Sequence, residues 1–418
     1  MASTNFEKYE FADRYSAAWA RLYGPSVDTA RQRERWGSLA ERHVAVFGKV
    51  PLLVFSSPGR IELLGNHTDH QHGKVLTASI QLDTLATVGE REGEISIQSG
   101  EYPMIRVRLD SPGLLPKEVG TSTAIVKGIL AYLVEHGYRV GGFVATMTSD
   151  VGRGSGVSSS ASFECCVVEI LNCLYNGGKI SPIEKARAAW WAETKYFGKP
   201  CGMLDQCAIA LGGVSYIDFA DPSAPVVEKL NLAMQESFLL LNTGGDHTQL
   251  THCYADIRKE MESVAEALGG KVLHDVEKEA DPVGRALRAG CSGRAVARAV
   301  HYVEENKRVE KARAAVKEGN ADELATLMEA SGDSSWKLLQ NLYVPGEATQ
   351  LIPAALCWMG ALGAKAKRVH GGGFAGTVLA LFGEGKLENA EKALAEHYGR
   401  ENLQRVWIRP DGACEVLV

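Results

Sequence analysis

The stretch Asp150–Ser162, DVGRGSGVSSSAS, places glycine at every second position from Gly152 to Gly156 and then continues as a run of serines. Glycine lets a backbone approach a ligand closely and adopt positive φ angles. The serines open an apolar stretch of helical length, residues 160–175, so backbone N–H groups and the positive end of a helix meet at one place. This combination favours a phosphate-binding loop. A flexible linker capped by serine is the plainer alternative for the stretch taken alone.

The loop belongs to neither of the two commonest nucleotide-binding types. A P-loop needs Lys after glycine and directly before Ser or Thr, and no such tripeptide occurs in the chain. A dinucleotide-binding fingerprint also fits poorly, because serines occupy the positions where the helix should start and no acid follows about twenty residues on at the end of a second strand.

A second polar segment follows in Glu193–Gln206, ETKYFGKPCGMLDQ. Glu193 lies near the end of a helix expected over 183–198, and Asp205 begins another helix after the break at Gly202. Carboxylates on both sides of one turn could face a single cavity. Solvated acids at helix ends are the ordinary alternative, since an acid near a helix N-terminus stabilises it by about 0.3–1 kcal/mol.

A third segment, His370–Gly376, HGGGFAG, lies between strands expected over 365–369 and 377–382. Glycine in a β-region costs conformational entropy unless the backbone must bend or admit a close neighbour. The segment therefore predicts a close approach, with a plain tight connection as the alternative.

These three segments, in this order, resemble the signature motifs of the GHMP kinase superfamily. The stretch Ser57–His70, SPGRIELLGNHTDH, narrows the resemblance to the galactokinase family, whose first motif reads roughly GRxNLIGEHTDY. The resemblance covers about residues 20–418. It implies a two-lobed α+β fold, with an N-terminal lobe like a ribosomal protein domain over 20–221, a ferredoxin-like C-terminal lobe over 222–418, and the active site between them. The irregular order of expected strands and helices agrees with α+β, and the turn at 222–225 supports the boundary.

The activity that the resemblance implies is ATP-dependent phosphorylation of the anomeric hydroxyl of galactose, with Mg²⁺ as the cofactor. Arg60 and Asp205 match the catalytic pair, and Ser160 and Glu193 match the magnesium ligands. The expected contacts to the ATP phosphates come from Gly154, Ser155, Gly156, Ser158, Ser159 and Ser160, and the expected sugar contacts come from Asn66, His67, Asp69, Gly202 and Tyr254. Taken singly, these residues have structural readings as well: a turn histidine, an Asx-turn former, or an aromatic on a helix face.

The sugar motif departs from the family at three positions. Asn66 stands where the family has Glu, Glu62 where it has Asn, and His70 where it has Tyr. An amide in place of a carboxylate removes a charged acceptor and supplies two donors. One hypothesis is that Asn66 shifts sugar discrimination and tolerates a carboxylate at carbon 6, as in galacturonate. The other is that Glu62 or His70 restores the lost contact.

The alternative functions are a kinase for galacturonate or N-acetylgalactosamine, and a non-catalytic galactose and ATP sensor. A sensor would be expected to have lost part of the serine run or of the catalytic pair, and both are present. Composition excludes other classes. The 418 residues carry a formal net charge of −6, so no global basic field attracts nucleic acid or an anionic membrane.

No apolar run approaches the length of a membrane span, and the nine cysteines, odd in number and without metal-site spacing, favour a reducing cytoplasm. The expected partners are a sugar and ATP, and the oligomeric state is left open, monomer included.

Overall fold

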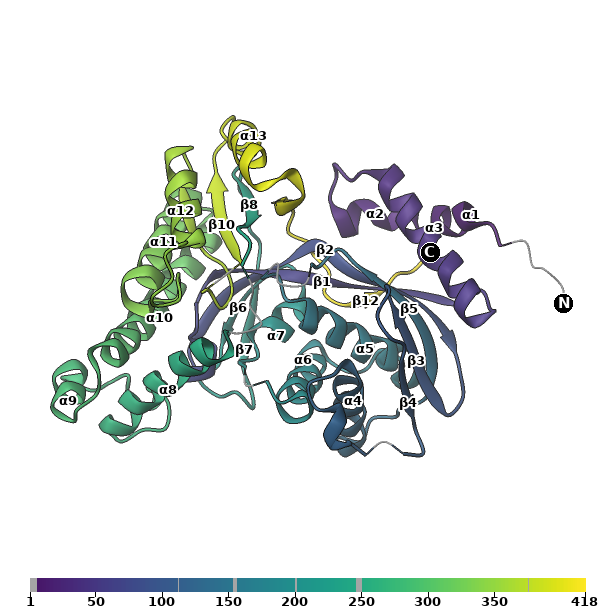
Figure 1. Ribbon diagram of the computed structural model, residues 1–418, viewed down its shortest axis with the longest axis horizontal. Coiled ribbons are helices and arrows are strands. Elements are labelled where there is room, and N and C mark those ends of the chain that lie inside the picture. Colours follow the sequence, from purple (N-terminus) through teal and green to yellow (C-terminus); the bar gives the residue numbers. More distant parts are fainter. Residues whose placement is uncertain (1–5, 112, 153–155, 200, 246–249, 375) are drawn as a thin grey trace.

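Two β-sheets organise the chain (Figure 1), and the computed structural model describes residues 6–111, 113–152, 156–199, 201–245, 250–374 and 376–418. The expected Gly154 and Ser155 contacts lie outside these residues. Within the described part of the chain, no helix is long and apolar enough to cross a membrane.

The first sheet has the order β12-β1-β2-β5-β3-β4, and β6 and β7 extend from β2. Only β3 and β5 pair in parallel among its described strands. Its two longest strands are buried over nearly their whole length, because helices cover both faces. The strands are β1 (Leu53–Leu64), β2 (Lys74–Glu90), β3 (Glu94–Ser99), β4 (Ile105–Arg108), β5 (Phe143–Ser149), β6 (Val214–Asp218), β7 (Val226–Leu230) and β12 (Cys414–Glu415).

Helices α4 (Ser122–Glu135), α5 (Ser159–Asn176), α6 (Pro182–Trp191) and α7 (Leu204–Leu211) lie together beneath this sheet in Figure 1. An aromatic-rich cluster of α1 (Lys8–Arg14), α2 (Ser16–Tyr23) and α3 (Thr29–Phe47) packs on Val54 and Leu85. The serine run begins α5 as the sequence predicts. The helix expected over 183–198 forms α6 and then widens to a π-helical segment, Ala192–Phe197, which contains Glu193.

The second sheet is antiparallel, with the order β11-β8-β10-β9. Its strands are β8 (Ser237–Asn242), β9 (Ala366–Val369), β10 (Thr377–Phe382) and β11 (Leu403–Val406). The expected strand over 377–382 is confirmed, and the strand expected over 365–369 begins one residue later. The helices that accompany this sheet are α8 (Thr251–Leu268), α9 (Pro282–Arg288), α10 (Gly293–Glu318), α11 (Ala321–Ser334), α12 (Leu351–Ala361) and α13 (Leu387–Tyr398).

Two strands cross the lobe boundary expected at residue 222. β7 follows that boundary but pairs with β6 in the first sheet, and β12 returns from the second sheet to pair with β1. The strand pairing therefore passes from one sheet to the other after Leu230 and comes back near the C-terminus. The division into 20–221 and 222–418 stays a prediction.

Candidate active site

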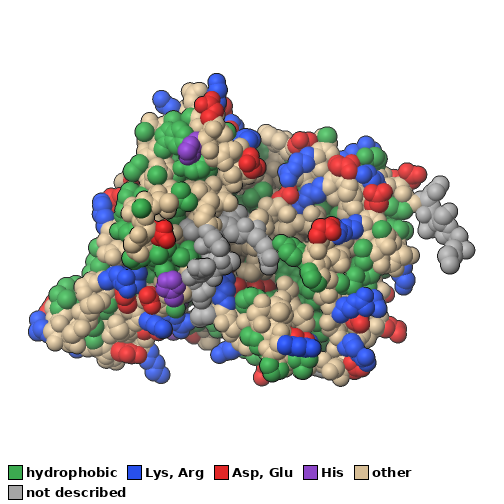
Figure 2. All heavy atoms as spheres, viewed as in Figure 1, with side chains coloured by type: hydrophobic (Ala, Val, Ile, Leu, Met, Phe, Trp, Pro, Cys, Tyr) green, Lys and Arg blue, Asp and Glu red, His purple; other side chains and the backbone are tan. Residues whose placement is uncertain are grey.

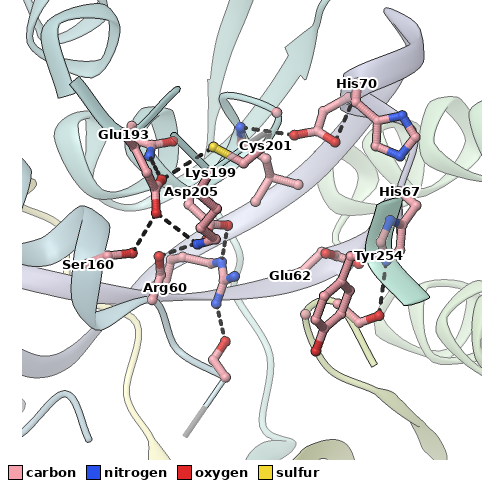
Figure 3. A pocket seen from close by; sticks show the side chains of 18 of the residues that line it. Arg60, Glu62, His67, His70, Ser160, Glu193, Lys199, Cys201, Asp205 and Tyr254 are labelled. Carbon is pink, nitrogen blue, oxygen red and sulfur yellow. Dashed lines mark hydrogen bonds and ion pairs between the residues drawn. The ribbon is translucent and has the colours of Figure 1, made fainter. Parts of the chain in front are cut away.

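A cavity of about 430 Å³ is lined by segments from both halves of the chain (Figure 3). β1 and the loop after it, the start of α5, the turn before α7, α8 and the glycines before β10 all contribute. The structure brings together every described candidate from the sequence: Arg60, Asn66, His67, Asp69, Gly156, Ser158, Ser159, Ser160, Glu193, Gly202, Asp205 and Tyr254. The face of the molecule seen in Figure 2 carries both signs of charge.

Arg60 and Asp205 form an ion pair in this cavity. Arg60 Nε donates to Asp205 Oδ1 at 2.7 Å, and Ser158 Oγ donates to the other carboxylate oxygen at 2.7 Å. Arg60 also donates to the carbonyl of Gly156, which fixes the guanidinium against the phosphate loop. Burial opposes the charge of Asp205, but Arg60 and Ser158 outweigh it and hold its pKa below the ordinary value. Asp205 is therefore an ionised carboxylate at neutral pH.

Ser160 and Glu193 lie beside this pair. Ser160 Oγ donates to Glu193 Oε1 at 3.1 Å, and both residues line the cavity. A hydroxyl and a carboxylate at this separation fit Mg²⁺, which takes oxygen ligands and keeps several waters or phosphate oxygens in its shell. In this structure Lys199 Nζ holds the same Glu193 oxygen at 2.8 Å. A bound cation would compete with Lys199 for that oxygen.

The loop after β1 has a strained backbone that the other half of the chain holds in place. Gly65 has φ 105° and His67 has φ 57°, a region that side chains rarely adopt. From α10, Glu305 Oε1 accepts from the Gly65 amide at 2.8 Å, and His301 Nε2 donates to the Asn66 carbonyl at 2.9 Å. His67 Nε2 donates to the carbonyl of Gly372 at 3.0 Å. Burial lowers the pKa of His67 to about 4, so this imidazole is neutral.

Asp69 and Gly202 meet at the same end of the cavity. Asp69 accepts from the amides of Leu204 at 3.2 Å and His70 at 2.9 Å. Burial raises the pKa of Asp69 to about 6, and the charge of Asp205 adds to the rise. A side chain at Gly202 would overlap the Asp69 carboxylate, so the glycine is required by close packing.

Asn66 and Tyr254 complete the candidate sugar contacts. Asn66 Nδ2 donates to Glu62 Oε1 at 3.0 Å and to the carbonyl of Gly371 at 2.8 Å. Tyr254 Oη donates to the carbonyl of Gly373 at 3.1 Å, and burial raises its pKa to about 12. The glycines before β10 therefore approach both residues, as the sequence predicts for this segment.

Three further residues, Lys199, Gln206 and Glu164, surround the Glu193 carboxylate without having a role predicted from the sequence. Gln206 Nε2 bridges two carboxylates, at 3.1 Å from Glu164 and 2.7 Å from Glu193. Two signals could have found this group. Lys199 and Gln206 lie within the segment that begins at Glu193, and Glu164 stands one helical turn after Ser160 on the same face of α5.

Three segments of the chain match models of known protein families. Residues 41–90 match the galactokinase galactose-binding signature, residues 124–213 the GHMP kinase N-terminal domain, and residues 312–400 the GHMP kinase C-terminal domain. The chain is 32% identical to a galactokinase of Pyrococcus furiosus, over 83% of this chain and 93% of that protein. It is 31% identical to a human galactokinase, over 84% of this chain and 89% of that protein.

Solved structures show the same relationship. The Lactococcus lactis galactokinase complexed with galactose superposes with a TM-score of 0.77 at 25% identity, covering 91% of this chain and 99% of that one. The Methanococcus jannaschii mevalonate kinase superposes with a TM-score of 0.62 at 17% identity, covering 85% of this chain and 98% of that one, which shows the shared fold. The chain belongs to the galactokinase family of the GHMP kinases.

Proposed function

We propose that this protein transfers the γ-phosphoryl group of Mg-ATP to the anomeric hydroxyl of galactose and releases galactose 1-phosphate. The observation that carries the proposal is the placement of one ionised carboxylate, Asp205, between a cation, Arg60, and the hydroxyl of Ser158 at the start of α5. Candidate phosphate and metal contacts lie on one side of this carboxylate, and the candidate sugar contacts lie on the other (Figure 3).

In this mechanism Asp205 orients the sugar hydroxyl and accepts its proton, while Arg60 offsets charge on the transferring phosphoryl group. Because its pKa is lowered, Asp205 is a weak base, and a weak base removes the proton late in a loose transition state. Asp205 therefore contributes to catalysis more by positioning the sugar hydroxyl than by removing its proton. The backbone around Gly156 and the hydroxyls of Ser158, Ser159 and Ser160 hold the phosphates. Ser160 and Glu193 would hold Mg²⁺, which neutralises phosphate charge when bound.

Family membership supports the reaction, since three curated relatives at more than 30% identity are galactokinases. The chain departs from the family motif at Asn66, Glu62 and His70, so the sugar preference is the part of the proposal that most needs a direct test. The cytoplasm stays the expected compartment, and the oligomeric state stays open.

The test is a coupled ADP-release assay with Mg-ATP and, in turn, galactose, galacturonate, N-acetylgalactosamine, glucose and no sugar. We expect the highest kcat/KM with galactose. A higher kcat/KM with another galacto-sugar would change the substrate in this proposal and leave the proposed reaction type unchanged. Binding of galactose and ATP without turnover of any sugar would favour the sensor.

A further inference from the structure

Asn66, the residue expected to change the sugar contact, has no hydrogen-bonding capacity left for a sugar. Its two amide protons go to Glu62 Oε1 and the Gly371 carbonyl. Its oxygen accepts from Asn341 Nδ2 at 2.9 Å and from Ser335 Oγ at 3.4 Å. An amide offers two donors and two acceptor sites, so all four are used within the protein. The side chain of Asn66 is a structural link between the halves of the chain.

Glu62 is different, because only one of its two carboxylate oxygens is bonded. Oε1 accepts from Arg368 at 2.7 Å as well as from Asn66. Among the residues that the structure describes, no hydrogen bond to Oε2 is seen. The side chain lines the cavity and keeps 5% of its surface exposed, so the unbonded oxygen is the part of this group that a ligand can reach. An acceptor buried in this way gains from a hydroxyl partner.

The position of Glu62 on β1 agrees with contact to a sugar. Arg60 and Glu62 are two residues apart on a regularly paired part of the strand, so both side chains point to the same face, about 7 Å apart along it. That distance is about the width of a pyranose ring. In the view of Figure 3, Glu62 lies between Arg60 and Tyr254. With the anomeric hydroxyl at Arg60 and Asp205, Glu62 faces the opposite side of the ring.

We infer that Glu62 is the specificity-determining carboxylate of the sugar site, accepting a hydrogen bond through Oε2 from one galactose hydroxyl remote from the anomeric carbon. Glu62, on β1 and four residues before position 66, thus supplies the carboxylate that Asn66 lacks. An acceptor oxygen of Glu62 thus faces the cavity, and a sugar carboxylate such as that of galacturonate would meet it as a second acceptor without a proton to share, so the site disfavours that sugar. The inference rests on the proposed sugar-kinase function of this cavity.

The test pairs Glu62→Gln with galactose analogues that each lack one hydroxyl. The glutamine oxygen can still accept from Arg368 and Asn66, which leaves an amide donor where the acceptor stood. We expect kcat/KM for galactose to fall about 10- to 100-fold, as for loss of a charged hydrogen bond. For the one analogue that lacks the contacted hydroxyl, the same substitution should lower kcat/KM less than about threefold. The ratio of kcat/KM for galactose to kcat/KM for galacturonate should also become smaller.

Glu305→Gln is the matched control, because Glu305 is a buried carboxylate that holds the same loop without lining the cavity. It should lower kcat/KM for every analogue by one common factor. The same uniform loss with Glu62→Gln, or no loss at all, would overturn the inference. If Glu62→Gln does not fold, Glu62→Asp keeps the charge beside Arg368 and should show the same selectivity for one hydroxyl.

Calorimetric binding of galactose and its analogues, with and without a non-hydrolysable ATP analogue, separates this inference from the proposed function. Wild-type protein that binds galactose without phosphorylating it would refute the kinase. The effect of Glu62→Gln on binding across the analogues would still decide the role of Glu62.

Discussion

Asp205 owes its charge to its neighbours, since burial alone would favour the protonated form. One oxygen faces the guanidinium of Arg60 and the other faces the hydroxyl of Ser158. The side chain is therefore held in one orientation before any substrate arrives, which is the preorganisation that phosphoryl transfer requires.

Replacing Asp205 by Asn should lower kcat by roughly 100- to 10,000-fold, the range for loss of a positioned proton acceptor. Sugar binding should change little, because Asn keeps the shape and one acceptor. Rapid-quench turnover and calorimetry on the same preparation check this. Normal turnover by Asp205→Asn would refute the assigned role.

Asp69 predicts a pH dependence of sugar binding. Its pKa of about 6 reflects burial and the charge of Asp205, so lowering the pH through 6 protonates it. The protonated acid has less capacity to accept from sugar hydroxyls. Galactose affinity should therefore fall between pH 7 and pH 5, and Asp69→Asn should bind weakly with a flat profile over that range. If galactose affinity of Asp69→Asn still fell with the same midpoint pH as in the wild type, another group would be responsible for the pH dependence.

At the scale of elements, the segment from α6 to α7 sets the positions of Glu193 and Asp205. The π-helical turn Ala192–Phe197 carries Glu193, and Gly198 ends it with φ 88°. π-Helical turns are rare and often lie at functional sites. The chain then passes Gly202 and starts α7, which carries Asp205.

Gly202→Ala should raise KM for galactose at least about tenfold, because a methyl group there must displace the Asp69 carboxylate. KM for ATP should change less than about twofold. Gly293→Ala, at the start of α10 where added carbon meets no neighbour, is the control and should leave both constants unchanged. Equal effects of Gly202→Ala on both substrates would indicate a general distortion.

Ser160→Ala removes a candidate magnesium ligand from the first turn of α5. The Mg²⁺ concentration for half-maximal activity should rise about tenfold or more, since one oxygen ligand is lost. Ser162→Ala tests the same helix away from the cavity, because Ser162 Oγ donates to the Ser57 carbonyl at 2.8 Å. That variant should lose thermal stability with an unchanged Mg²⁺ requirement. Unchanged Mg²⁺ dependence in Ser160→Ala would remove Ser160 from the metal site.

At the scale of the whole molecule, buried and half-buried histidines connect pH to stability. Burial lowers the pKa of six of them: His43, His67, His70, His72, His301 and His370. Each is neutral in the folded protein and takes up a proton in the unfolded chain below about pH 6.5. Stability from these groups is complete above about pH 6.5 and is lost as the pH falls through their lowered folded-state pKa values, which are about 4 for His43 and His67. Asp69 acts in the opposite direction through its raised pKa.

Thermal unfolding should therefore show a constant Tm between pH 7 and pH 8 and a falling Tm below pH 6.5. His43, with a pKa of about 4, lies outside the cavity and is bonded to Thr87 and Thr146, so His43→Gln isolates one contribution. Its stability deficit relative to wild type should shrink by up to about 3 kcal/mol between pH 7 and pH 4. Denaturant titrations at both pH values measure this difference. A stability deficit that is independent of pH would show that protonation of His43 does not contribute to the pH dependence of stability.

The sequence by itself determined where the candidate loops lie and which residue types they carry. The start of α5 lies within a residue of its expected place, and the described candidate residues line one cavity, because glycine spacing, serine hydroxyls and helix starts are local properties. The π-helical turn at Glu193 was not predicted, since it depends on packing against α4. The return of β12 to the first sheet was not predicted either, because pairing between distant strands leaves no local pattern.

Only the tertiary structure decided which side chains of the altered motif remain available to a ligand. Residue type at position 66 suggests a changed sugar contact. In the folded chain, however, the Asn66 side chain is hydrogen-bonded to three residues that are distant in the sequence, Asn341, Ser335 and Gly371. Arg368 in turn fixes one oxygen of Glu62 and leaves the other toward the cavity. Which polar group remains available to a ligand depends on which hydrogen bonds folding has already formed. Those bonds join residues whose proximity exists only in the folded chain.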